Sequence, residues 1–244
     1  MTAPAAPSAL VTGGGTRLGA AIARALAAAG YDLVVHYATS RAGAEAVAAE
    51  ARALGRRAIA FGADLRDPGA LDALAEAALA FGGGRLDALV HNAGVYERVE
   101  PAALDDAALE RALDVNLRAP YRLTLRLRAA LERARGSVVA ITDIAAERPW
   151  ADHLPYSVSK AALAQLVRAW ALALAPSVRA NAVEPGPVLP AERDLEAGAA
   201  GLLASVPLGR FGAEGDVARA VLFLLQNDYV TGHALRVDGG RSLA

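Results

Sequence analysis

The chain has 244 residues, of which 55% are hydrophobic, and its formal net charge is −1. Such a near-neutral charge offers no basic surface to nucleic acid or to an anionic membrane, so we expect neither as a partner. The absence of cysteine excludes disulfides, thiol catalysis and cysteine-based metal sites, and the four histidines lack metal-ligand spacing, so no metal is expected. Because no stretch has the pattern of a signal peptide or a membrane span, we expect a cytoplasmic protein.

Short runs rich in leucine, valine and isoleucine alternate with longer segments of helical period, a pattern typical of βαβ units around a parallel sheet. We therefore expect an α/β fold over residues 1–244: a single Rossmann-type domain with a doubly wound parallel sheet of about seven strands and helices on both faces. In chain order the expected strands are Ala9–Thr12, Asp32–His36, Arg57–Phe61, Ala88–His91, Ser137–Thr142, Val178–Glu184 and Ala234–Val237. The expected helices are Leu18–Ala29, Ala42–Leu54, Gly69–Ala80, Leu104–Arg133, Pro155–Ala175 and Gly215–Leu225.

The stretch from Pro185 to Gly212 departs from this alternation, with four prolines and five glycines around a weak helical segment. It follows the sixth expected strand. Ligands of open α/β sheets bind beyond the carboxyl ends of the strands, so residues 187–212 are predicted to form a substrate lid.

A glycine-rich loop follows the first expected strand and opens directly into a helix. Its residues include Gly13, Thr16, Arg17, Leu18 and Gly19. Small residues there let a backbone approach a pyrophosphate, and the helix N-terminus offers unpaired N–H groups. The loop therefore predicts a dinucleotide site, although a plain tight turn has the same composition.

The end of the second expected strand indicates which dinucleotide is bound. NAD-binding chains usually carry Asp or Glu about 20 residues after the glycine loop, where it holds the ribose hydroxyls. Here His36 and Tyr37 occupy that position, Ser40 and Arg41 follow, and Arg17 lies in the loop. Cations and hydroxyls without an acid favour a 2′-phosphate, so NADPH/NADP is the predicted cofactor.

Asp64 and Leu65 follow the third expected strand, where an adenine amino group can be recognised. Asp64 could equally cap the next helix. Both interpretations place it at the same edge of the sheet, so it is included among the candidate cofactor residues.

Lys160 is the only lysine beside 24 arginines, and it stands four residues after Tyr156. If this stretch is helical, both side chains share a face. A neighbouring ammonium favours phenolate over phenol, so we expect Lys160 to lower the pKa of Tyr156 and make it a general acid or base. The alternative is a surface lysine beside a packed tyrosine.

These pieces together resemble the short-chain dehydrogenase/reductase family over essentially the whole chain. The order and distances of the glycine loop, Asn92-Ala93-Gly94, Asn116, Tyr156 with Lys160, Pro185-Gly186 and Asp238-Gly239-Gly240 carry the resemblance. It implies that Tyr156 donates a proton, that Lys160 also binds the nicotinamide ribose, and that Asn116 orders a water. The cofactor residues it adds are Asn92, Ala93, Gly94, Thr142, Pro185, Gly186 and Val188.

Two residues depart from the usual family pattern. Thirteen residues before Tyr156, where a serine is usual, stands Asp143, and Arg17 stands where glycine is more common. An ionised Asp143 would repel a developing oxyanion, which argues against ketone reduction, but it suits a ring nitrogen that must be protonated. Alternatively, Thr142 supplies the hydroxyl after a one-residue shift of register.

Arg17 together with Asp143 resembles the pteridine reductases, including bacterial dihydrofolate or dihydromonapterin reductases of this family. In that group an aromatic residue stacks on the pterin, and Tyr96 occupies its position, unless it is a lid or interface aromatic. Arg17 would then contact both cofactor and substrate. Gly94 in place of a serine and Ala38-Thr39 in place of a more basic pair depart from the group.

Three functions follow from these residues. The first is NADPH-dependent reduction of a pterin or dihydrofolate-type ring, with Arg17, Tyr96, Asp143 and Tyr156 contacting the substrate. The second is carbonyl reduction, for example of 3-oxoacyl thioesters, and the third is a non-catalytic NADPH-binding regulator. The resemblance also implies a homotetramer, in which the helices at 104–133 and 155–175 pack between subunits.

Overall fold

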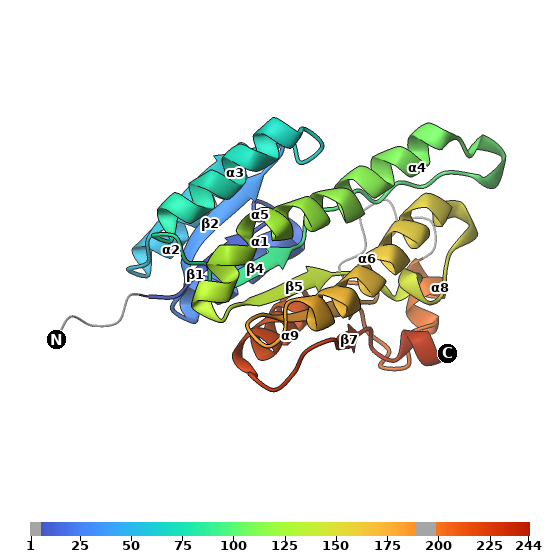
Figure 1. Cartoon of the computed structure of the whole chain (residues 1–244). Helices are drawn as coiled ribbons and strands as arrows, with labels where there is room; N and C mark the ends of the chain where they lie inside the picture. The colour runs from blue at the N-terminus through green and yellow to red at the C-terminus, as the bar shows by residue number, and fades with distance from the viewer. Residues whose placement is uncertain (1–5, 189–198) are drawn as a thin grey trace.

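The structure is a computed structural model, and it describes residues 6–188 and 199–244. Its centre is a seven-stranded sheet of order β3-β2-β1-β4-β5-β6-β7, in which every neighbouring pair is parallel (Figure 1). The strands are β1 (Ser8–Val11), β2 (Asp32–Tyr37), β3 (Ala58–Gly62), β4 (Ala88–His91), β5 (Ser137–Ile141), β6 (Arg179–Pro185) and β7 (Ala234–Val237). The predicted doubly wound α/β fold is confirmed.

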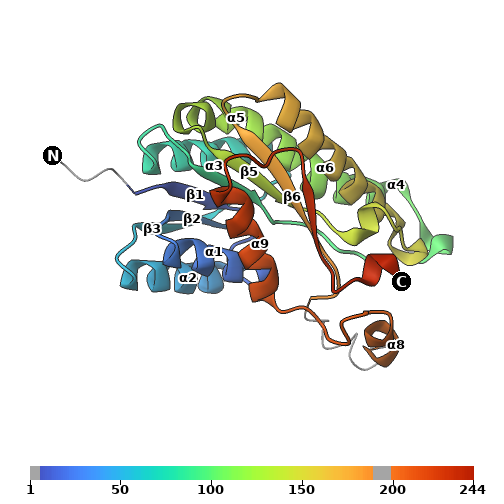
Figure 2. The ribbon, with the colours of Figure 1, turned by 90° about the horizontal axis from the view of Figure 1, so that it is seen from below.

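Helices cover both faces of the sheet, as Figure 2 shows from below. One face packs against α1 (Arg17–Ala28), α2 (Arg41–Ala53) and α9 (Glu214–Gln226). The other packs against α3 (Pro68–Phe81), α5 (Ala119–Ala134) and α6 (Leu154–Ala173). The remaining described α-helices are α4 (Asp106–Leu113) and α8 (Ala199–Ala204).

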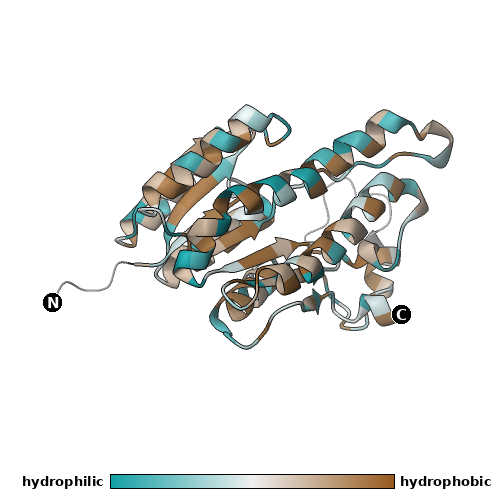
Figure 3. Ribbon diagram, in the orientation of Figure 1, coloured by the Kyte–Doolittle hydropathy of each residue, from teal (hydrophilic) through white to brown (hydrophobic). Residues whose placement is uncertain are grey.

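The strands are apolar on both faces because each face carries its own hydrophobic core. Successive residues alternate between the two cores: Leu89 and Val138 pack into one, whereas Val90 and Val139 pack into the other. Alternation of side chains across a strand makes this unavoidable in a sheet covered on both sides. Figure 3 shows the result as brown strands beneath helices whose outer sides are teal.

The predicted single helix Leu104–Arg133 is wrong in its middle. The structure ends α4 at Leu113 and inserts a π turn, Asp114–Arg118, before α5 begins at Ala119. The N–H of Ala119 donates to the carbonyl of Asp114, five residues back. Such turns carry one residue more than an α-helix needs, and they are common at functional sites. The turn contains Asn116, whose buried side chain finds its partners outside the helix.

Strand order reverses direction between β1 and β4, which places a crevice at their carboxyl ends. The residues that follow β1, β2, β4, β5 and β6 therefore converge on one edge of the sheet. Beyond β6, Val188 pairs with Gly212 and closes the base of the predicted 187–212 lid. Residues 189–198 of that segment lie outside the described residues, so the lid stays a prediction. Within 6–188 and 199–244, no helix is long and apolar enough to cross a bilayer.

His91, the last residue of β4, ties the sheet to two helices. Its Nε2 lies 2.8 Å from the hydroxyl oxygen of Thr124 on α5, and its ring stacks on Trp170 of α6 at 5.7 Å between centroids. Burial lowers the pKa of His91 from 6.5 to about 3. The histidine is therefore a neutral core residue.

This burial predicts a pH-dependent stability. A base whose pKa is lowered by folding binds its proton more readily in the unfolded chain, so its contribution is complete above pH 6.5 and is lost as the pH falls toward 3. Between pH 6.5 and 5, the unfolding free energy of the wild type should fall by about 2 kcal/mol more than that of His91→Gln. Urea unfolding at several pH values measures this. Thr124→Val, which keeps the titrating ring, should retain the wild-type slope, and parallel slopes for wild type and His91→Gln would contradict the assignment.

Candidate active site

In the glycine loop after β1, the two ends of the loop pack closely against each other. Gly13 has φ +63°, a conformation that favours glycine, and a Cβ on Gly19 would lie 2.0 Å from the Gly13 carbonyl oxygen. The amide of Asn92, which follows β4, donates to the carbonyls of Thr12 and Gly13 at 3.0 and 3.1 Å. These bonds join the loop after β1 to the segment after β4. The small residues of the loop leave its backbone open to a dinucleotide phosphate.

His36 supports this loop from β2 and does so as a neutral ring. Its Nδ1 accepts the N–H of Gly13 at 3.1 Å, and its Nε2 lies 3.0 Å from the carbonyl of Ala63. Since the backbone N–H can only donate, Nε2 must carry the proton and donate to Ala63. Burial lowers the pKa of His36, in keeping with this arrangement. His36 thus shapes the cofactor loop, in addition to lining the cavity beside Tyr37.

Arg17 begins α1 with a φ of 46°. A non-glycine residue in this left-handed region carries strain of about 1–3 kcal/mol. The geometry explains why glycine is the easier residue at this position of the loop. It also aims the backbone so that Arg17 lines the cavity together with Thr16 and Leu18.

After β3, Asp64 is paired with Arg66 at 2.6 Å, and this contact lowers the pKa of Asp64. The alternative of Asp64 as a helix cap is wrong, because Asp67 caps α3 by accepting the N–H of Gly69. Ser40 lines the cavity and makes no side-chain capping bond. Arg41, predicted beside it, is exposed at the start of α2 and does not line the cavity.

The opposite end of the cavity holds the tyrosine and its neighbours. The hydroxyl of Tyr156 donates to Asp143 Oδ2 at 2.8 Å, while Asp143 Oδ1 accepts the N–H of Ala145 at 2.8 Å. One turn along α6, the Lys160 ammonium donates to the carbonyl of Ile141 at 2.8 Å. Tyr156 and Lys160 are both buried, so the alternative of a surface lysine is wrong.

The pKa values of these groups differ from the sequence expectation. Burial raises the pKa of Tyr156 well above 10, and Asp143 raises it further by its charge and its hydrogen bond, so Lys160 does not lower it in the structure. Burial lowers the pKa of Lys160 to about 8 and raises that of Asp143. The sequence spacing correctly brings Tyr156 and Lys160 to one helix face, 5.6 Å between Nζ and the ring centroid. It contains no information on burial or on the position of Asp143.

Asn116 lies one layer behind the cavity wall. Its Oδ1 accepts the N–H of Val95 at 2.8 Å, and its Nδ2 donates to the carbonyl of Val95 and to Ser159 Oγ at 3.1 and 2.9 Å. Asn116 therefore holds the segment that follows β4, at Val95, against α6. Its predicted role in ordering a water stays a prediction.

Thr142 cannot replace the usual family serine in this geometry. Its hydroxyl is buried and donates to the carbonyl of Val183 at 3.0 Å, toward β6. The side chain that faces Tyr156 is Asp143. The one-residue shift of register is therefore not adopted.

An aromatic wall completes this end of the cavity. Tyr96 stacks on His153 at 4.5 Å between centroids and meets the edge of Tyr156 at 4.9 Å. Trp150 approaches both Tyr96 and His153 edge to face. Tyr96 is about half exposed, so it offers a flat apolar surface at the mouth.

The cavity has a volume of about 820 Å³. Of the predicted site residues, all line it except Arg41 and Asn116; the group brought together is Gly13, Thr16, Arg17, Leu18, Gly19, His36, Tyr37, Ser40, Asp64, Leu65, Asn92, Ala93, Gly94, Tyr96, Thr142, Asp143, Tyr156, Lys160, Pro185, Gly186 and Val188. The cavity residues absent from the predicted set include Val95, Val115, Glu214 and Arg241. For Arg241 a signal existed, because it directly follows the double glycine 239–240, whose positive φ angles turn the chain.

A glycine cradle at one end and a buried Tyr–Lys pair at the other define a Rossmann-type oxidoreductase. The family model described as enoyl-(acyl carrier protein) reductase matches residues 15–242. The chain belongs to this family of short-chain dehydrogenases/reductases, as the sequence resemblance predicts. Among the described residues, no group of three or more His, Cys, Asp or Glu is placed to hold a metal ion.

Similar proteins cover nearly the whole chain. A solved structure of a blue fluorescent protein from a metagenomic library, in complex with NADPH, is 36% identical with a TM-score of 0.89, and the match covers 96% of this chain and 97% of that one. The 3-oxoacyl-[acyl-carrier-protein] reductase of Synechocystis is 34% identical over 98% of both chains. The dihydromonapterin reductase of Klebsiella pneumoniae is 31% identical over 96% of both chains. The predicted NADPH/NADP cofactor agrees with family membership and with the NADPH complex.

The close packing of the glycine loop, the proposed phosphate cradle, predicts the effect of adding one methyl group at Gly19. In Gly19→Ala the new Cβ would clash with the Gly13 carbonyl, so the loop must shift and the phosphate contacts weaken. We expect NADPH affinity to fall about 10- to 100-fold, measured by the fluorescence of bound NADPH. Gly215→Ala, whose Cβ would meet only Arg219 Nη1 at 3.5 Å, should bind NADPH like the wild type. Equal affinity of the Gly19 and Gly215 variants would rule out the phosphate cradle.

Proposed function

We propose that the chain is an NADPH-dependent reductase of a pterin or dihydrofolate-type ring. The observation that carries the proposal is the hydrogen bond from the Tyr156 hydroxyl to the Asp143 carboxylate, at the position where the family more often has serine. A relative that is 31% identical is a dihydromonapterin reductase, which supports the same substrate class.

The choice of NADPH over NADH follows from the charges at the adenosine end. The last residues of β2, His36 and Tyr37, provide no carboxylate for ribose hydroxyls, and Arg17 and Ser40 line the cavity nearby. Asp64 is neutralised by Arg66 and therefore repels a 2′-phosphate less. When bound, the cofactor supplies the hydride.

The protein's part in the reaction is to move and hold a proton. A ring nitrogen that gains electrons must be protonated, and the hydrogen-bonded Tyr156 and Asp143 share a proton at the same end of the cavity. Burial raises the pKa of Asp143, so the pair retains its proton more readily at neutral pH. Once that proton is transferred, an anionic Asp143 stabilises positive charge on the ring, whereas it would repel the oxyanion of a ketone.

The substrate side of the cavity suits a flat ring. Tyr96 offers half-exposed aromatic surface, and Tyr156 closes the cavity edge-on to it. Aromatic faces gain about 0.5–1.5 kcal/mol from such contacts beyond area burial. Lys160 lies one helical turn from Tyr156 and reaches the same end as the nicotinamide ribose would.

A substrate panel tests the proposal. We expect oxidation of NADPH with dihydrobiopterin and dihydrofolate, faster than with NADH and faster than with an acetoacetyl thioester. Tyr156→Phe should lower kcat at least about 100-fold, because it removes a positioned proton donor. Turnover of the thioester alone would favour the 3-oxoacyl reductase that the Synechocystis relative represents, and NADPH binding without any turnover would favour the regulator.

Asp143→Ser separates the two chemistries within one protein. It replaces the carboxylate with a hydroxyl that can donate to an oxyanion, so pterin reduction should fall about 10-fold or more while carbonyl reduction rises. The ratio of kcat/KM for dihydrobiopterin to that for an acetoacetyl thioester measures the switch. Asp106→Ser, at the exposed start of α4 and outside the cavity, is the control and should leave the ratio unchanged. A thioester rate that falls together with the pterin rate would count against the role assigned to Asp143.

The predicted homotetramer is also part of the proposal. Tyr121 and Leu125 on α5 and Leu154 and Val158 on α6 are each more than two-fifths exposed, an unusual cost for large apolar side chains. We expect light scattering after gel filtration to give four times the chain mass of 25.0 kDa. Leu125→Glu should shift that mass downward, whereas a monomeric wild type would refute the assembly.

A further inference from the structure

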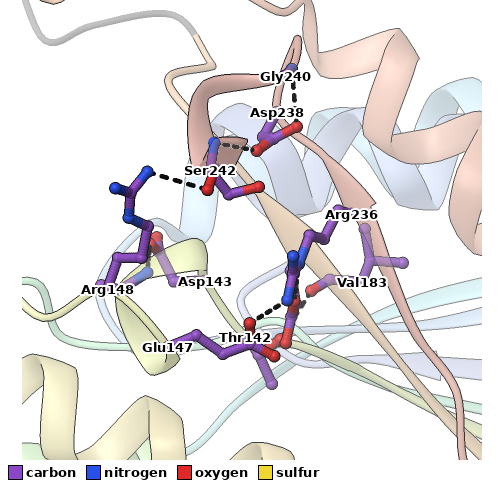
Figure 4. A network of polar contacts seen from close by, with 11 residues as sticks. Thr142, Asp143, Glu147, Arg148, Val183, Arg236, Asp238, Gly240 and Ser242 are labelled. Carbon is purple, nitrogen blue, oxygen red and sulfur yellow. Dashed lines mark hydrogen bonds and ion pairs between the residues drawn. The ribbon is translucent and has the colours of Figure 1, made fainter. Parts of the chain in front are cut away.

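The last described residues form a rigid turn beside the substrate end of the cavity. Asp238 accepts the N–H of Gly240 at 2.9 Å and the N–H of Ser242 at 2.7 Å, as Figure 4 shows. Gly239 and Gly240 both have positive φ, which lets the chain reverse at this point. Arg241 lies between the two bonded N–H groups, so its backbone is fixed.

A second contact holds this turn against the loop that carries Asp143. One nitrogen of Arg148, Nη1, donates to the carbonyls of Arg241, Ser242 and Ala244 at 3.3, 2.9 and 2.5 Å. Arg148 lies five residues after Asp143 in the same loop. Figure 4 labels Arg148 and Asp143 together with Ser242 and Asp238 of the turn. The position of Arg241 is therefore coupled to that of the candidate catalytic carboxylate.

The guanidinium of Arg241 lies 5.5 Å from the centroid of the Trp150 ring and lines the cavity. Burial lowers its pKa and Asp143 raises it, and an arginine guanidinium keeps its charge at neutral pH. Stacking on an indole face holds a guanidinium without using its N–H groups. In the part of the chain that the structure describes, those N–H groups make no hydrogen bond or ion pair within bonding distance.

The other cations of the cavity have different positions. Arg66 is paired with Asp64 at the adenosine end, Lys160 donates to the carbonyl of Ile141, and Arg17 belongs to the glycine loop. Arg241 stands beside Trp150, whose ring meets Tyr96 edge to face at 6.4 Å. A flat substituent that extends from the substrate ring toward the mouth of the cavity would contact the Trp150 ring and then the Arg241 guanidinium.

We propose that Trp150 and Arg241 form a subsite for an aryl carboxylate substituent of the substrate. The inference rests on the proposed function and deepens it: the preferred substrate is a reducible ring that carries an acidic side chain, rather than a ring with a neutral one. Trp150 stacks on the aryl group, and Arg241 pairs with the carboxylate through its planar N–H groups. Arg241 is then a residue that determines specificity and takes no part in proton transfer.

A competing role for Arg241 is to hold Asp143 in its ionised form. The two roles predict different kinetics. If Arg241 acts on Asp143, its loss affects the reaction of every substrate and shifts the pH dependence of kcat. A carboxylate subsite affects KM only for substrates with the acidic group.

Steady-state kinetics with NADPH separate these roles. For Arg241→Gln, KM for dihydrofolate should rise about 10-fold or more, the effect of losing a charge-assisted hydrogen bond, while kcat and the KM for dihydrobiopterin stay within about twofold. Arg219→Gln, at an exposed position of α9, is the matched control and should behave as wild type. Equal losses on both substrates, or a shifted pH profile of kcat, would overturn the subsite.

Calorimetry tests the subsite without turnover. Protein saturated with NADP⁺ is titrated with 4-aminobenzoylglutamate and with 4-aminobenzamide, which lacks the carboxylates. Wild type should bind the first about 10-fold more tightly than Arg241→Gln does, and the second equally. Unchanged NADPH affinity of the variant shows that it is folded. If wild type reduces neither pterin, the proposed function fails on its own; if it reduces both but binds 4-aminobenzoylglutamate independently of Arg241, only the subsite fails.

Discussion

The hydrogen bond between Tyr156 and Asp143 is the interaction on which the candidate site depends. It joins the first turn of α6 to the loop that leaves β5, and the bond from Lys160 to the carbonyl of Ile141 joins the second turn of α6 to the end of the same strand. Both bonds are largely shielded from water, where a hydrogen bond to a charged group is stronger and an unpaired partner is costly. The tyrosine, the lysine and the carboxylate therefore have one arrangement relative to the sheet.

At the other end of the cavity, the glycine loop is held by hydrogen bonds between neutral side chains and backbone groups. Asn92 bonds the carbonyls of Thr12 and Gly13, and His36 accepts the N–H of Gly13, so the loop after β1 is held by side chains from β2 and from the segment after β4. Because these contacts use neutral groups, the loop keeps its shape without a counter-charge. The arrangement leaves the positive end of α1 available to an anion.

The strands were predictable almost to the residue, because a sheet covered on both faces needs apolar side chains on both sides of each strand. The break at Asn116 was not predictable, since Asp114–Arg118 contains neither glycine nor proline and its π turn depends on partners at Val95 and Ser159 far along the chain. The approach of Tyr156 and Lys160 followed from their spacing on one helix, whereas the place of Asp143 came from the family resemblance. The effect of Lys160 on the tyrosine did not, because burial and the Asp143 charge outweigh a cation 5.6 Å from the ring.

The π turn at Asn116 imposes a rule on chain length. Since it holds one residue more than a regular helix, deleting any residue of Asp114–Arg118 would let α4 run into α5 as an uninterrupted α-helix. Because the wider turn absorbs the extra residue, the deletion would leave Leu123 and Leu127 of α5 facing the sheet. The backbone around Asn116 would instead lose the widening that lets this side chain reach Val95 and Ser159. Relatives that share this site should accordingly tolerate substitutions in the segment far better than a change in its number of residues.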